Sequence, residues 1–179
     1  LDETYRKASL KDVKDIKSFE ALKNLKFIEY PKKGFNELEK IVDKISKLGG
    51  GIMLIDYGYL NKINKSTLQA VMKNKKMSMS RLFKNLGRAD ITYLVNFRLL
   101  KEFFSKKKLK VKNVVSQKFF LEKMGIIQRA KILEKKMTKN QEEYMSSTLI
   151  RLLHKDFMGS LFKVIFAFKS KKNNFLGFE

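Results

Sequence analysis

The apolar positions in the first part of the chain predict a strand followed by a helix. Apolar and polar residues alternate from Leu25 to Glu29, which predicts a short strand that Pro31 closes. Apolar residues then recur at helical spacing from Phe35 to Leu48. Asn36 and Glu39 stand three residues apart near the start of this run, so they predict a capping pair at the beginning of the helix.

Three glycines, Gly49–Gly51, separate this helix from a second apolar run. They are expected to end the helix. Ile52–Ile55 is too short for a helix and predicts a buried strand, which brings Asp56, Tyr57 and Gly58 to its C-terminal end. A glycine loop that binds nucleotides follows a strand and opens a helix, whereas these glycines close a helix. They therefore do not predict a phosphate-binding loop.

The rest of the chain predicts further strands and helices. In chain order, these are a strand over Thr67–Met72, a loop over 73–88, a strand over Ile91–Phe97, a helix containing Leu99, Leu100, Phe103 and Phe104, a strand over Leu109–Val115, a helix from the cap Ser116 to Gly125, a helix opened by Thr138 and Gln141 as a capping box, and a strand over Leu161–Phe168. This order indicates an α/β sheet with an antiparallel portion. No repeat or linker divides residues 1–179, so we expect a single domain.

Composition restricts the function classes. The sequence has no run of about 18 apolar residues, so no membrane span is expected. It has no Cys, which excludes disulfides, thiolate zinc sites and cysteine nucleophiles. The net charge of +22 suggests nucleic acid, but 34 of the 40 basic residues are Lys, spread along the whole chain. Base and phosphate readers favour the Arg fork, so specific nucleic-acid binding is not predicted.

Few residues offer catalytic chemistry. His154 is the single histidine and stands at a predicted helix end, so no metal site and no catalytic triad is predicted. Among the few carboxylates, Glu29 and Asp56 end predicted strands and Asp90 precedes another. Asp90 also suits a turn or cap, and Glu29 a surface position. Asp56 is the strongest candidate because it follows four apolar residues, where an ionised side chain is rare unless it is paired or functional.

Several segments, taken together, resemble the MidA-like family of S-adenosylmethionine-dependent methyltransferases. The matching segments, in family order, are Glu29 for the Glu of a Glu-x-Ser-Pro motif, Gly50–Gly58 for a glycine, strand and Asp-Tyr-Gly motif, Thr67–Ala70, Ala89–Thr92, Gln117–Ala130 and Met158–Val164. The sequence departs from the family where Pro31 and Lys32 replace the Ser-Pro and where Asn74 and Asn96 replace a usual His and Asp.

The resemblance implies a Rossmann-like class I methyltransferase fold with additional antiparallel strands and helices. It implies that the chain is the C-terminal half of the enzyme, inactive alone, because the family's glycine-rich cofactor-binding half has no counterpart here. Asp56, Tyr57, Glu29 and Asp90 are the candidate catalytic residues, and Gly58 would lie nearest the S-adenosylmethionine cofactor.

The family includes the mitochondrial arginine methyltransferase that assists respiratory complex I assembly. The resemblance thus implies arginine methylation of a protein, with a complex I subunit as the candidate acceptor. It places the enzyme in the cytoplasm of a bacterium or the mitochondrial matrix of a eukaryote. The alternative is a non-enzymatic basic module that binds nucleic acid or an acidic protein partner.

Overall fold

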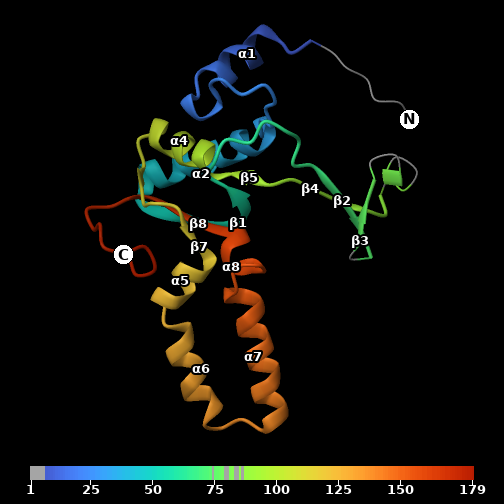
Figure 1. The fold of residues 1–179 in the computed structure, drawn as a ribbon. Helices are drawn as coiled ribbons and strands as arrows, with labels where there is room; N and C mark the ends of the chain where they lie inside the picture. Colours follow the sequence, from blue (N-terminus) through green and yellow to red (C-terminus); the bar gives the residue numbers. More distant parts are fainter. Residues whose placement is uncertain (1–6, 74, 79–80, 83–84, 86) are drawn as a thin grey trace.

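The computed structural model describes residues 7–179 except 74, 79–80, 83–84 and 86. Its centre is a mixed sheet of five strands (Figure 1). β1 (Gly50–Tyr59) and β8 (Phe162–Lys169) pair antiparallel from Gly50 opposite Lys169 to Tyr57 opposite Phe162. β5 (Val95–Asn96) joins the C-terminal end of β1 in parallel. β6 (Lys110–Val111) and β7 (Val115–Ser116) follow one another along the other edge of β8.

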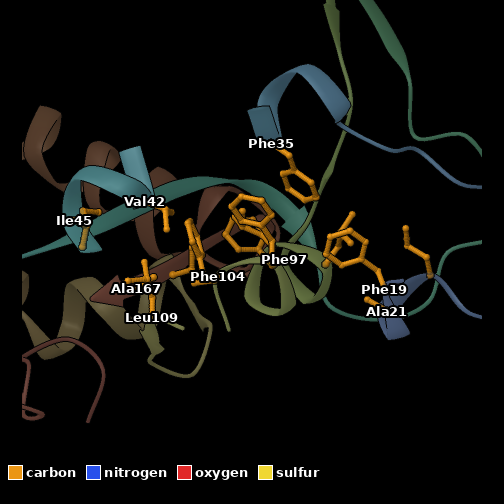
Figure 2. Close-up of a cluster of buried hydrophobic side chains, with 14 residues drawn as sticks. Phe19, Ala21, Phe35, Val42, Ile45, Phe97, Phe104, Leu109 and Ala167 are labelled. Carbon is orange, nitrogen blue, oxygen red and sulfur yellow. The ribbon is translucent and has the colours of Figure 1, made fainter. Parts of the chain in front are cut away.

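Two helices build the main hydrophobic core with this sheet. α2 (Lys32–Leu48) and α4 (Phe97–Lys106) pack against β1 and β8. Phe97 and Phe104 of α4 are fully buried, and the Phe35 ring of α2 stacks on Phe103 with 4.3 Å between ring centroids. Figure 2 shows Phe35, Phe97 and Phe104 in one cluster with Val42, Leu109 and Ala167. The helical spacing of apolar residues in both helices therefore serves one shared core.

The N-terminal elements are held against α4. α1 (Leu10–Lys17) leads into the short 3-10 helix η1 (Glu20–Leu22). The Glu102 carboxylate of α4 accepts hydrogen bonds from the backbone amides of Glu20 and Ala21, each at 2.8 Å. A carboxylate at a helix N-terminus satisfies amides that have no partner within the helix.

Two groups of elements extend away from the core (Figure 1). One is a separate three-stranded antiparallel sheet of β2 (Gln69–Met72), β3 (Lys75–Met77) and β4 (Asp90–Thr92). The other lies between β7 and β8 and consists of α5 (Gln117–Lys123), α6 (Ile126–Glu134), α7 (Lys139–Leu153) and α8 (Met158–Leu161). No helix in the described ranges is long and apolar enough to cross a membrane.

The predicted strand over Leu25–Glu29 is wrong. This segment is irregular, and no described strand pairs with it. Ile28 and Tyr30 pack against the core cluster, and the Glu29 side chain binds another loop. The predicted capping pair of Asn36 and Glu39 is also wrong. α2 begins at Lys32, directly after Pro31, whose carbonyl accepts from the Phe35 amide at 2.9 Å.

Other strand predictions require new boundaries. β1 continues beyond Ile55 to Tyr59, because β8 pairs with it as far as Tyr57 and β5 pairs with its last two residues. Asp56 therefore lies inside the strand and not at its end. The predicted strand over Ile91–Phe97 divides into β4 and β5, and the helix that follows begins at Phe97, with the Asn96 side chain as its cap.

The second half also contains confirmed predictions. Ser116 caps α5 by accepting from the Phe119 amide at 3.2 Å, and the capping box of Thr138 and Gln141 opens α7. The predicted strand over Leu109–Val115 forms two short strands instead, β6 and β7, with an irregular segment between them. The predicted loop over 73–88 contains β3, and its residues 74, 79–80, 83–84 and 86 lie outside the described residues.

Two glycines give a matched test of this packing. A Cβ at Gly58 would lie 2.7 Å from the Phe97 ring and closer still to the Val95 carbonyl oxygen. We expect Gly58→Ala to lower the free energy of unfolding by at least about 1–3 kcal/mol, because backbone and core would have to move. Gly34 lies in the first turn of α2, where a Cβ finds ordinary contact at 3.7 Å.

Gly34→Ala should instead raise the free energy of unfolding by up to about 1 kcal/mol, through helix propensity. Urea unfolding followed by circular dichroism measures both variants. Equal effects of the two substitutions would contradict the close approach of β1 to β5 at Gly58.

Candidate functional site

The candidate site lies where the parallel strands β1 and β5 end. Tyr59 and Asn96 are register partners at these carboxyl ends, the position where open α/β sheets bind ligands. A cavity of about 180 Å³ adjoins them. Its polar lining residues are Glu29, Tyr59, Tyr93 and Asn96, and apolar residues of α2 and α4 close its inner side.

Glu29 joins three separate segments around this cavity. One carboxylate oxygen accepts from the Thr67 amide at 2.8 Å and the Ser66 hydroxyl at 3.2 Å, and the other accepts from the Thr67 hydroxyl at 2.5 Å. The Thr67 hydroxyl oxygen in turn accepts from the Leu94 amide at 3.0 Å. The segment before α2, the loop before β2 and the loop before β5 are thereby fixed to one another.

This arrangement restricts what Glu29 can do. A carboxylate has about four acceptor positions, and three of those of Glu29 are filled by Ser66 and Thr67. Glu29 therefore cannot hold a guanidinium through both oxygens without releasing the loop. Its carboxylate mainly holds Thr67, and through Thr67 Leu94, in place. One of its hydrogen-bond acceptor sites stays available for a ligand.

Tyr59 contributes a partly buried hydroxyl beside this network. Burial raises the pKa of Tyr59 above its usual value, and the negative charge of Glu29 acts in the same direction. A hydrogen bond from the Asn96 side chain opposes both effects. The Asn96 side chain can bind Tyr59 through its nitrogen and cap α4 at the same time, because its oxygen accepts from the Leu99 amide at 3.0 Å.

A second cavity of about 360 Å³ lies beside the first. Both are lined by Glu29, Pro31 and Tyr93. The second adds Phe27 and Tyr30, so several aromatic residues share its lining with Glu29. We call the two together the Glu29 cavities. Among the described residues that line them, none is Lys or Arg.

The structure brings only Glu29, of the four predicted catalytic residues, to these cavities. Asp56 lies opposite Lys163 within the sheet and accepts from the Tyr57 amide at 2.8 Å. Tyr57 packs edge to face on Phe162, with 5.6 Å between ring centroids. Asp90 is exposed at the start of β4, in the outer sheet. Catalytic roles for Asp56, Tyr57 and Asp90 stay predictions, and the structure does not gather them with Glu29.

Sequence reasoning assigned no role at this site to four of its residues. Thr67 binds Glu29, and Tyr59, Tyr93 and Asn96 line the same cavity as Glu29. The sequence singled out only Thr67 and Asn96, the first as part of a family motif and the second as a departure from one. Tyr59 directly follows the Asp-Tyr-Gly segment. A strand prediction that extended to Tyr59 would have placed its side chain at the carboxyl end of the sheet.

Comparison with known sequences decides the family. Residues 3–115 match a family described as "Putative S-adenosyl-L-methionine-dependent methyltransferase", and this stretch is more than half of the 179 residues. The chain belongs to this methyltransferase family. The match includes Glu29, Thr67, Asn96 and all of β1.

Two solved structures share the fold. An uncharacterized protein from Burkholderia thailandensis is 21% identical, with a TM-score of 0.63 over 77% of this chain and 38% of its own. A second protein from that organism is described as a "likely methyl transferase" bound to S-adenosyl-homocysteine. It is 23% identical, with a TM-score of 0.59 over 72% of this chain and 34% of its own. The predicted Rossmann-like methyltransferase fold is confirmed. The chain spans little more than a third of these relatives.

The cavity at the ends of β1 and β5 is small for a cofactor site. It has about 180 Å³, less than the roughly 300–1,000 Å³ typical of small-molecule sites. Gly49–Gly51 lie at the opposite end of β1 from this cavity. No group of three His, Cys, Asp or Glu side chains suited to a metal occurs in the described part of the chain.

Glu29→Gln tests the network. An amide nitrogen cannot accept from Thr67, so we expect the free energy of unfolding to fall by about 1–3 kcal/mol. Glu37→Gln is the matched control, because Glu37 is exposed and, among the described residues, pairs only with Lys40 one turn away. It should change the free energy by no more than about 0.5 kcal/mol. Equal losses in urea unfolding would contradict the linking role of Glu29.

Tyr59 predicts a stability change at high pH. Its raised pKa means that the folded protein keeps the phenol proton after the unfolded chain, with a pKa of about 10, has lost it. The stability that depends on Tyr59 is therefore complete below that pH and is lost as the pH rises through the folded pKa. Subtracting the ultraviolet phenolate titration of Tyr59→Phe from that of the wild type isolates Tyr59. A midpoint at or below that of free tyrosine would contradict the burial.

Proposed function

We propose that this chain forms the acceptor-binding side of a methyltransferase that uses S-adenosylmethionine, and that the Glu29 cavities receive a cationic acceptor group. The guanidinium of a protein arginine is the group that fits best. The observation that carries this proposal is the distribution of charge. The chain has 40 basic residues and a net charge of +22, yet no described Lys or Arg lines either cavity.

The cavity walls suit a flat cation. The rings of Tyr59 and Tyr93 border the cavity beside Glu29, and Phe35 lies at its inner side. Aromatic faces attract guanidinium groups, by about 0.5–1 kcal/mol where exposed and more where water is excluded. The remaining acceptor position of Glu29 can take one guanidinium N–H. Recognition thus combines stacking with a single charged hydrogen bond.

The rest of the enzyme would complete the site. The edge of β1 that faces away from β8 has no strand partner over Gly50–Tyr57 among the described residues. An unpaired edge of this length normally accepts another strand or is covered. We propose that the part of the enzyme that its longer relatives have, and that this chain does not span, pairs there and supplies the cofactor-binding wall. The acceptor would be a protein, and the resemblance to the MidA-like family supports a complex I subunit.

A small probe tests acceptor binding. Ethylguanidinium titrated into the 15N-labelled chain should shift the backbone amide signals of Glu29, Tyr93 and Asn96, with a dissociation constant of about 1–10 mM. Tyr93→Leu should weaken this binding because it removes a stacking face. Tyr144→Leu is the matched control, since Tyr144 is 74% exposed on α7 and lines neither Glu29 cavity.

Equal weakening by the two substitutions, or shifts spread over exposed acidic residues such as Glu37 and Asp43, would contradict the proposed acceptor site. The same titration with S-adenosylmethionine should show no micromolar binding, because the chain alone offers one wall. Micromolar binding of S-adenosylmethionine would contradict the proposal that another part of the enzyme supplies the cofactor-binding wall. It would not change the outcome of the ethylguanidinium test.

A further inference from the structure

The helical extension between β7 and β8 contains a groove separate from the Glu29 cavities. α5 packs against both α6 and α7, whereas α6 and α7, joined by residues 135–138, make few contacts with each other in the described part (Figure 1). The space between their facing sides is a groove of about 700 Å³. Since β7 and β8 pair with each other, the sheet fixes the base of this extension.

The groove is apolar inside and basic at its edges. Its apolar lining includes Ile126, Ala130, Leu133, Met145, Leu149 and Leu152. Arg129 and Lys136 border it, and no acidic residue is among its described lining residues. Leu133 is 37% exposed and Tyr144 74% exposed. Apolar side chains that gather in an open groove with a polar edge mark an interaction site.

The lining suits the apolar face of a helix. Amphipathic helices bind by laying one apolar face into an apolar groove of this kind. Such a face presents residues at i, i+3, i+4 and i+7. The walls here are themselves helices of 9 and 15 residues. A third helix between them would complete a three-helix arrangement and cover the exposed lining.

Charge selects among the possible occupants. A second copy of this chain carries the same net charge of +22, so the copies repel each other. Arg129 and Lys136 at the edges favour a segment that carries carboxylates there. We propose that the groove between α6 and α7 binds an amphipathic helix of a partner protein, with an apolar stripe and acidic flanks.

Synthetic helices test this proposal with the 179-residue chain. The probe is a fluorescent peptide with a leucine stripe at helical spacing and Glu at its flanks. One control peptide has the same stripe with Lys at its flanks, and another has the probe's composition in scrambled order. Fluorescence anisotropy should show binding of the probe at least about tenfold tighter than of either control. Equal binding of the scrambled peptide would show that net charge alone causes the binding, and it would overturn the proposal.

Neighbouring residues on α6 supply matched variants. Leu133 lines the groove, whereas Ile132 is 59% exposed and does not line it. Leu133→Ser should weaken the probe about tenfold, and Ile132→Ser should leave it within about twofold. Arg129→Gln should weaken it more than Lys131→Gln, which removes the same charge outside the groove. Equal effects within either pair would overturn the proposal, and circular dichroism confirms that each variant keeps its helices.

Sedimentation equilibrium without peptide tests the second copy as occupant. The chain should sediment as a monomer. A dimer that is lost in Leu133→Ser and kept in Ile132→Ser would show that the groove receives another copy of the chain, which would also overturn the proposal.

Discussion

The antiparallel pairing of β1 with β8 is the interaction on which the rest of the structure depends. It joins residues more than a hundred positions apart, from Gly50 opposite Lys169 to Tyr57 opposite Phe162. One side of this pair supports α2 and α4 and their shared core. The pair also places Gly58 and Tyr59 beside β5 and, through β7, fixes the base of the helical extension. The site and the groove are both built on this pair.

Local chemistry predicted several elements where capping or periodicity acted within one segment, although the capping pair of Asn36 and Glu39 was wrong. The α2 periodicity, the Ser116 cap and the capping box at Thr138 all appear in the structure. Elements that depend on distant partners were predicted less well. The strand expected at Leu25–Glu29 is absent from the described structure, and β1 extends to Tyr59 because distant strands supply its hydrogen bonds.

The candidate site shows the same division. Glu29 could be selected from sequence as one of few carboxylates, but its contacts with Thr67, and through Thr67 with Leu94, join positions 27 to 38 residues apart in the chain. Sequence placed Asp56 first because it follows an apolar run. The structure places it inside the sheet, and the aromatic lining from Tyr59 and Tyr93 became visible only in three dimensions. In this strongly basic chain, no described Lys or Arg lines either Glu29 cavity, while Arg129 and Lys136 border the groove, and this contrast is why we propose ligands of opposite charge for the two sites.

A crystal structure of the chain with ethylguanidinium tests the central claim most directly, namely that the Glu29 cavities receive a cationic group. The account predicts density for a planar cation between the Tyr59 and Tyr93 rings, with one N–H toward Glu29 and with the Glu29–Thr67 hydrogen bonds intact. Density only at other acidic surface positions, or a Glu29 side chain that leaves Thr67 to bind the probe through both oxygens, would contradict it.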